Sequence, residues 1–480
     1  MLERLVMKYL SAPLPILLMA LIGWHCTSLS ITMLTKNDPY PLYTTAYPYH
    51  YLLFGITNYL KGITCEPILN RFSFTVSPFH QKANIGRDFD GTRSYLGDLE
   101  GKWYMLGMLY GALPTGCSFT TTVGDGCVNQ LGRAKEIIFG IPANDMVPCD
   151  RVLTDTTGNV GYFSVPLKYR KSGVRFELNF QPFEDFGLTL QWGLADIKQT
   201  LTSFIDLTQT VSFDTSFFPE LVIQQVETLL MSSTQADEIF RQIGLETCDF
   251  EEDSVEDIRY FVWWRHPFEI CNFDYCCASP LLFIPFVQLE GTIPTAKKQN
   301  RRKAFALPFG NDGHASIGAT AGFHLDFFDT IEFGFLGGYT YFFPRTIDLF
   351  RLPNSTQQSG VFPCATTVKK TPGHNSIFGV LFHAYRFLDC FSFYAEYDYI
   401  HHTEDTIEID ESSPAFGQNP PAFIPRQSEC LSKWRVQVLN TALNYEISPN
   451  LTIGLAVQWP MTQRNAYRST TVLGSLIATF

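Results

Sequence analysis

Apolar and polar residues alternate one by one along several stretches of the chain, and this two-residue period restricts its fold more than any other feature. In residues 174–181, Val, Phe and Leu alternate with Arg, Glu, Asn and Gln, and residues 186–195 repeat the pattern after a short connection. Successive side chains of a β-strand point to opposite faces, whereas a helix repeats every 3.6 residues. The two stretches therefore predict a β-hairpin.

The same alternation recurs along the rest of the chain. It is clear in residues 316–327, 331–341, 391–399 and 451–459, and weaker in residues 72–79, 102–110, 161–168, 282–293, 377–387 and 434–445. In the last stretch the phase slips near Leu439 and Asn440, which a β-bulge in that strand would explain. About thirteen strands result, and bacterial membrane barrels have an even number, so twelve or fourteen are expected.

The composition fits a membrane barrel and a large soluble all-β protein equally well, so neither is excluded by composition alone. Charged residues make up 17% of the chain and aromatic residues 15%, whereas soluble domains average roughly 25% charged residues. After the N-terminus, no stretch has the roughly 18 uncharged apolar residues that a transmembrane helix needs. A chain that enters a membrane without such a helix must form a closed barrel, because only then are its backbone groups paired. The net charge of −12 argues against a nucleic-acid partner.

The N-terminus has the pattern of an export signal. Arg4 and Lys8 supply positive charge, and the apolar stretch that follows, residues 12–24, is too short for an ordinary transmembrane helix. We expect a signal peptide in residues 1–30, an N-terminal extension in residues 31–70 and the barrel in residues 71–480.

Two insertions are expected outside the strands. Residues 112–158, rich in Gly, Thr, Cys and Pro, predict an irregular loop. Residues 199–280 contain apolar residues at helical spacing, including Val222, Val226 and Leu229, and predict a plug, a cap or a periplasmic lobe. Short turns near residues 329, 389 and 450 are expected at the periplasmic end, with long loops at the other end.

Polar residues opposite the apolar stripes are expected to line the lumen. They are Arg175, Glu177, Gln191, Glu290, His324, Asp326, Glu332, Glu396, Asp398, Arg435, Gln437 and Gln458. Six carboxylates against two arginines predict an acidic lumen with a mild preference for cations. The alternative is that the charges near strand ends face bulk water. For mid-strand positions the lumen is favoured, because a charge facing lipid costs about 2–4 kcal/mol.

The twelve cysteines make disulfides possible in an exported chain. Cys117 and Cys127 are close enough in sequence to close a loop, and Cys248 and Cys271 flank one segment, so these four are the disulfide candidates. The cysteine spacing does not match a zinc site.

Other clusters of reactive or charged residues lead to no predicted site. The chain contains no GxSxG, HExxH or P-loop motif, and we expect no catalytic residue, metal or cofactor. The basic run 297–303 predicts a solvated turn, with contact to anionic lipid or polysaccharide as the alternative. The acidic run 249–257 predicts a solvated surface, with calcium binding as the alternative.

The chain ends in residues 471–480, where Val472, Gly474, Leu476, Ala478 and Phe480 share one face. This stretch resembles the C-terminal strand of bacterial outer-membrane proteins, whose terminal aromatic residue is similar to the signal read by the barrel-assembly machinery. The resemblance covers about ten residues directly. The architecture is similar to that of porins and fatty-acid-type channels of Gram-negative bacteria. It implies a place in the outer membrane, contact with its lipids and recognition of Phe480 by the assembly machinery.

These features predict an all-β protein, a transmembrane antiparallel up-and-down β-barrel of 12–14 strands with a helical insertion. We expect a channel or transporter for small solutes in the bacterial outer membrane. Two alternatives remain open: a structural envelope protein cross-linked through its cysteines, and a barrel-embedded hydrolase. The sequence is compatible with a homo-oligomer.

Overall fold

The computed structural model describes most of the barrel and its loops. The described residues are 36, 71–111, 135–136, 161–183, 185–207, 239–271, 281–327, 330–388, 390–411, 422–448 and 450–480. The predicted signal peptide lies outside them, as do the predicted extension apart from Lys36 and nearly all of the 112–158 insertion.

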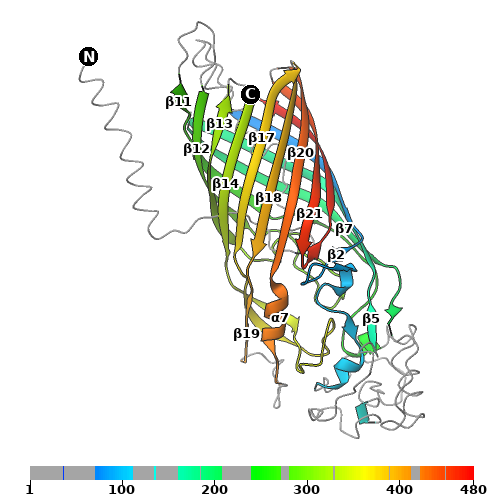
Figure 1. The fold of residues 1–480 in the computed structure, drawn as a ribbon. Coiled ribbons are helices and arrows are strands. Elements are labelled where there is room, and N and C mark those ends of the chain that lie inside the picture. Colours follow the sequence, from blue (N-terminus) through cyan, green and yellow to red (C-terminus); the bar gives the residue numbers. More distant parts are fainter. Residues whose placement is uncertain are drawn as a thin grey trace.

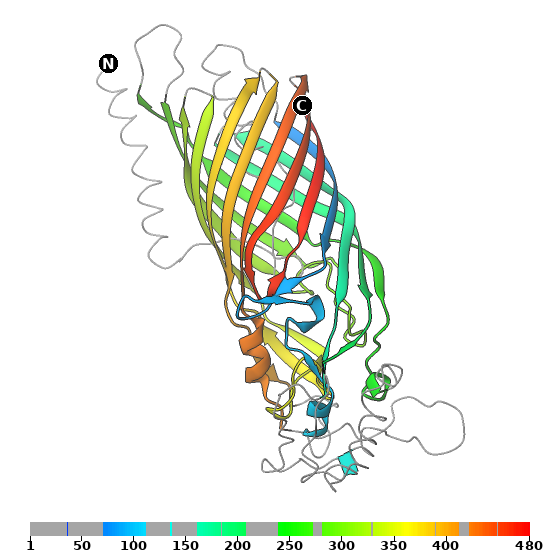
Figure 2. The same ribbon diagram turned by 45° about the vertical axis from the view of Figure 1, so that its right-hand side comes forward.

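Twelve antiparallel strands close into a barrel, which confirms the predicted all-β architecture (Figures 1 and 2). The ring closes where β10 pairs with β7, and β1 lies between the last strand, β23, and β6. In chain order the wall strands are β1 (Phe72–Ala83), β6 (Leu167–Phe183), β7 (Phe186–Leu201), β10 (Ile258–Arg265), β12 (Leu281–Ile293), β13 (Ser316–Phe327), β14 (Ile331–Phe342), β17 (Asn375–Leu388), β18 (Phe391–His402), β20 (Trp434–Ser448), β21 (Leu451–Arg464) and β23 (Thr470–Thr479).

The two ends of the barrel differ. Short connections join β6 to β7, β13 to β14, β17 to β18 and β20 to β21 at the end where the chain also finishes (Figure 1). Phe72 and Phe480 exchange two backbone hydrogen bonds there, 3.2 and 2.9 Å long. The predicted short turns therefore share one end of the barrel. That this end faces the periplasm stays a prediction.

Long connections leave the opposite end and fold over it (Figure 2). We call their described parts the cap: residues 84–111, 161–166, 202–207, 239–249, 294–315, 343–374, 403–411, 422–433 and 465–469. Its elements are β2 (Gly86–Arg87), β3 (Arg93–Ser94), η1 (Leu96–Asp98), β4 (Trp103–Tyr104), η2 (Leu106–Leu109), β5 (Tyr162–Ser164), β8 (Ile205–Asp206), β15 (Arg345–Arg351), β16 (Ala365–Thr371), β19 (Thr406–Ile409), α7 (Pro425–Ser432) and β22 (Ala466–Tyr467).

The cap has an apolar core of its own. The ring of Trp103 lies 5.1 Å from that of Phe240 and 5.9 Å from that of Phe305, measured between centroids, and Met108 and Leu109 are fully buried. Residues 102–110, which the sequence predicts as a wall strand, supply this core as β4 and η2. The prediction is wrong because apolar residues enclosed on every side need no alternation.

The outer face of the barrel is apolar and exposed, whereas the inner face is polar and buried. On β21, Leu455 is 56% exposed and its neighbour Ala456 only 4%. Large exposed side chains on the outer faces of other strands include Phe378, Val380, Leu443 and Leu476. This arrangement reverses that of a water-soluble protein and matches a barrel surrounded by lipid. Within the described ranges, no helix is long and apolar enough to cross a membrane.

The insertion predicted at residues 199–280 is shorter than expected. Its end forms β9 (Phe250–Val255), which pairs with β7, then the wall strand β10, then β11 (Phe268–Cys271), which pairs with β12. Only residues 239–242 are helical among its described residues, and they lie in the cap. The helical spacing at residues 222–229 falls outside the described residues.

Candidate functional site

The barrel interior collects most of the residues predicted to line it. Ten of the twelve point inward and are at most 8% exposed: Arg175, Glu177, Gln191, Glu290, His324, Asp326, Glu332, Glu396, Asp398 and Gln458. Their low exposure means that the inward side chains of the described strands have almost no contact with solvent.

Arg435 and Gln437 are the two exceptions, and both lie on the outer face of β20. The strand keeps one phase throughout, with Val436, Val438 and Asn440 on its inner side. The irregularity lies in the partner strand β21, where Gln437 pairs with Thr462 and Val438 with Pro460. The predicted slip inside β20 is therefore wrong. That predicted slip is the reason why Arg435 and Gln437 were expected on the inner face of β20.

Carboxylates and histidines meet on the inner face of four neighbouring strands. His324 Nδ1 of β13 lies 2.5 Å from Glu332 Oε1 of β14, and Tyr385 of β17 donates a hydrogen bond to the same carboxylate. On β18, Asp398 accepts a hydrogen bond of 2.9 Å from Asn440, whose amide oxygen accepts one of 3.1 Å from Gln458. Two groups of linked polar side chains therefore line the inner face, one on β13, β14 and β17 and the other on β18, β20 and β21.

Basic residues gather on the opposite wall, and the sequence pattern did not predict most of them. Arg175 and Lys171 of β6 both pair with Glu256, through Nε–Oε2 and Nζ–Oε1 distances of 2.7 Å. Arg259 and Arg265 of β10 also point inward and are buried. Lys171 lies four residues before Arg175 on the same face of β6. Continuing the alternation toward the N-terminus would therefore have predicted its inward position. The prediction of a solvated acidic run is wrong for Glu256 and Asp257, which are each 1% exposed.

A chamber of about 370 Å³ lies between the cap and the barrel. Gln199, His402 and Trp434, near the cap ends of β7, β18 and β20, form part of its wall, and the His402 and Trp434 rings stack with centroids 5.3 Å apart. The cap supplies Trp103, Phe305 and other apolar residues. No sequence pattern predicts this chamber, because its residues come from loops far apart in the chain.

Eight charged residues line the chamber. The bases are Lys36, Arg301, Lys303, Arg351 and Lys370, and the acids are Glu100, Asp312 and Asp405. Each acid pairs with a lining base: Glu100 with Lys36 at 3.2 Å, Asp312 with Arg301, and Asp405 with Lys370 at 2.7 Å. Lys303 pairs with Glu252 at 3.3 Å. Arg301 and Lys303 belong to the basic run predicted to be a solvated turn, so that prediction is wrong for these two residues.

Arg351 is the lining base that the described structure gives no carboxylate partner. Its guanidinium donates hydrogen bonds to the carbonyl oxygens of Phe362, Pro363 and Ile243, at 2.9, 3.1 and 2.6 Å. Burial lowers the pKa of Arg351 to about 10, so it stays charged at neutral pH. One uncompensated positive charge therefore remains in the chamber wall.

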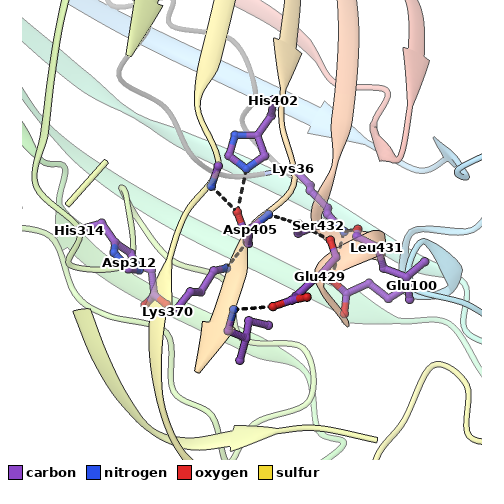
Figure 3. A network of polar contacts seen from close by, with 12 residues as sticks. Lys36, Glu100, Asp312, His314, Lys370, His402, Asp405, Glu429, Leu431 and Ser432 are labelled. Atoms are coloured by element: carbon purple, nitrogen blue, oxygen red, sulfur yellow. Dashed lines mark hydrogen bonds and ion pairs between the residues drawn. The ribbon is translucent and has the colours of Figure 1, made fainter. Parts of the chain in front are cut away.

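A hydrogen-bonded network fixes the rim of the chamber (Figure 3). His402 Nδ1 lies 2.6 Å from Asn375 Oδ1 and its Nε2 lies 3.0 Å from Asp405 Oδ1. The backbone N–H of Asp405 donates to Ser432 Oγ at 2.7 Å, which ties the turn to α7. Burial alone would raise the pKa of Asp405, but Lys370 and His402 outweigh it and hold that pKa well below its usual range.

Comparison with known proteins finds similarity in structure alone. No family model matches the chain, and no curated protein does. An outer-membrane channel from Pseudomonas putida F1 matches with a TM-score of 0.44 and 8% identity, over 86% of this chain and 96% of that one. The translocator domain of the autotransporter NalP from Neisseria meningitidis matches with a TM-score of 0.30 and 8% identity, over 92% and 99%. The toluene transporter TbuX from Ralstonia pickettii matches with a TM-score of 0.30 and 10% identity, over 86% and 90%.

The structure does not support the predicted disulfides. Cys248, one of the four candidates, has a free thiol and is exposed, so it forms no disulfide. Cys117 and Cys127 lie outside the described residues. Cys364, Cys390 and Cys430 are also free. Among the described side chains, no group of three or more His, Cys, Asp or Glu is arranged to hold a metal ion.

Proposed function

We propose that the protein is a channel of the bacterial outer membrane, through which small polar solutes pass by way of the chamber and the barrel interior. The observation that carries the proposal is the position of the chamber. Gln199, His402 and Trp434 line it from the cap ends of the wall strands, so it adjoins the polar interior. The exposed apolar outer face supports insertion in a membrane. The tight burial of the inward side chains implies that they move when a solute passes.

The charges of the interior favour cations. Seven carboxylates in the wall are buried, Glu177, Glu256, Glu290, Asp326, Glu332, Glu396 and Asp398, against the four bases Lys171, Arg175, Arg259 and Arg265. The chamber has the opposite balance, five bases against three acids. The interior is expected to set the selectivity, because its inward side chains are almost fully buried and charges act most strongly where water is scarce.

Single-channel recording in planar bilayers tests this proposal. In a KCl gradient the reversal potential should indicate a modest preference for K⁺, with a small conductance. The double variant Glu396→Gln/Asp398→Asn removes two inward carboxylates and should shift the reversal potential toward zero. Arg435→Gln is the control, because this outward charge should leave selectivity unchanged. Absence of conductance, or a preference for chloride, contradicts the proposal.

A structural role in the envelope is the second candidate, favoured by exposed free thiols. Cys248 and Cys430 both lie in the cap, exposed, where another chain can reach them. Under this proposal the protein from intact cells runs as high-mass species on a non-reducing gel and as a monomer after reduction. Cys248→Ser/Cys430→Ser should abolish those species. A monomer under both conditions rules out a cross-linked role.

A further inference from the structure

The outer face of β1, β6 and β7 changes from apolar to polar between two successive rows of register partners. Pro78 of β1 pairs with Val174 of β6, which pairs with Leu194 of β7, and these three form the last apolar row toward the cap. The next row holds His80, Ser172 and Asp196. The register therefore places the edge of the apolar belt at directly paired positions on three neighbouring strands.

One row further toward the cap, three basic side chains lie opposite one another. Lys82 pairs in register with Arg170, and Arg170 pairs with Lys198. We call these three residues the basic row. Lys168 follows two residues away on the outer side of β6. Lys82, Arg170 and Lys168 are exposed, and the side chain of Lys198 is 40% exposed.

Most of this positive charge is uncompensated within the protein. Lys198 pairs with Glu251 at the end of the row. Lys82, Arg170 and Lys168 form no ion pair with any described residue. Like charges directly opposite each other destabilise a pair of strands. A bound anion between Lys82 and Arg170 would remove that repulsion.

We propose that the basic row and Lys168 bind the phosphate groups of an anionic lipid in the leaflet on the cap side. The arginine fork and lysine ammonium both suit phosphate oxygens. Basic residues at the edge of an apolar belt attract anionic headgroups. The proposal rests on membrane insertion of the barrel and not on what the barrel conducts.

The surface below the row makes a lipid the better ligand than a free anion. Beneath Pro78, Val174 and Leu194 lie Val76, Phe176 and Trp192, in register on the same outer face. The rings of Phe176 and Trp192 stack, with centroids 5.6 Å apart. A lipid can therefore place its phosphates on the row and its acyl chains along this continuous apolar strip, whereas inorganic phosphate would gain only the charge contacts.

Acidic residues limit the site on one side. Asp196 lies one row below Lys198, and Asp253 of β9 is its register partner. Glu251 pairs with Lys198. Phosphate groups are repelled there, so the lipid headgroup is expected over Lys82 and Arg170 rather than toward β9.

Native mass spectrometry of the full chain, mixed in detergent with the diphosphorylated glycolipid lipid A, tests the proposal. The wild type should retain tightly bound lipid A, and Lys82→Gln/Arg170→Gln should lose at least one bound molecule per protein. The control Lys298→Gln/Arg302→Gln removes the same charge from exposed positions of the cap and should retain as much as the wild type. The charge-conserving Lys82→Arg/Arg170→Lys should also retain it.

Three results overturn the proposal. The first is that the Lys82→Gln/Arg170→Gln variant binds as much lipid A as the wild type. The second is that the cap control loses as much bound lipid A as that variant, which would indicate unspecific charge attraction. Displacement of the lipid by millimolar inorganic phosphate identifies a simple anion site instead. The heat-dependent gel shift of folded barrels confirms that each variant has folded, and channel recordings on the same samples separate failure here from failure of the proposed conduction.

Discussion

Lys370 Nζ lies 2.7 Å from Asp405 Oδ2, and this ion pair joins β16 to the turn that follows β18 at the chamber rim (Figure 3). The Asp405 side chain is 4% exposed and that of Lys370 20%. Asp405 also accepts the backbone N–H of Gly373 at 2.8 Å. One carboxylate therefore holds the turn after β18 to both the end of β16 and the turn that follows β16.

Asp405→Asn should loosen the cap. The substitution keeps the shape of the side chain but leaves Lys370 without its counter-charge, and breaking such a pair costs about 2–4 kcal/mol when the remaining charge is partly able to reach water. Pulse proteolysis in urea measures the effect as earlier cleavage of the cap. Glu408→Gln is a matched control, because the exposed Lys369–Glu408 pair, 2.9 Å apart, joins β16 to β19 right beside the Lys370–Asp405 pair. Equal effects of the two variants contradict the prediction.

His314 should make the protein less stable in mild acid. Its Nδ1 donates to the carbonyl of Phe343 at 2.9 Å, while its Nε2 is buried with no hydrogen-bond partner in the described structure. Burial, only partly offset by that hydrogen bond, lowers its pKa to about 4. Because the unfolded chain takes up the proton near pH 6.5, this contribution to stability is present above that pH. It is lost as the pH falls toward 4.

His314→Asn tests this effect, since Asn can keep the hydrogen bond to Phe343 but does not titrate. Relative to the variant, the wild type should lose about 2 kcal/mol of unfolding free energy between pH 7 and pH 5. Urea unfolding in detergent micelles, followed by tryptophan fluorescence, provides the measurement. Parallel pH profiles for the two proteins mean that His314 is accessible to protons in the folded state.

Leu455→Arg should distinguish a lipid-facing barrel from a water-soluble one. Leu455 is 56% exposed in mid-strand on the outer face of β21. In water, replacing an exposed Leu changes stability little, but an arginine in the middle of a bilayer costs about 2–4 kcal/mol. Unfolding from lipid vesicles gives the value. Thr200→Arg is the control, because this residue lies on the outer face of β7 beyond the apolar belt, and it should change the free energy by less than about 1 kcal/mol.

The sequence predicts a wall strand correctly where one face of the strand meets lipid and the other meets the polar interior, because apolar and polar residues then alternate. β13 has the predicted boundaries and phase, and β21 has the predicted start and phase but continues past the predicted residue 459 to Arg464. The rule fails for β10, whose inner side carries Arg259, Phe261, Trp263 and Arg265, because no contrast remains between its two faces. It also fails for Arg435, which lies beyond the apolar belt of the outer face. An outward charge there does not have to enter lipid, so it costs no free energy.

The chamber could not be predicted because no period links its residues. Arg301, Arg351 and Asp405 come from three different loops, and only the closed barrel brings these loops over one opening. The sequence does contain the charges, but a run such as residues 297–303 gives no sign of which side chains face water and which face the chamber. The pairing with Asp312 and Glu252 decides that, and it depends on contacts between distant segments.

The free cysteines should differ sharply in reactivity in the native protein. Cys248 and Cys430 are exposed, whereas Cys364 is buried beside Arg351 and Asn354, and burial raises the pKa of its thiol to about 11. Because the thiolate is the reactive form, Cys364 combines poor access with low ionisation. Brief treatment of the folded protein with a maleimide should therefore modify Cys248 and Cys430 and spare Cys364, as read by peptide mass spectrometry. Modification of all three at equal rates before denaturant is added would show that the cap opens on the timescale of labelling, and denatured protein is the control in which all three react.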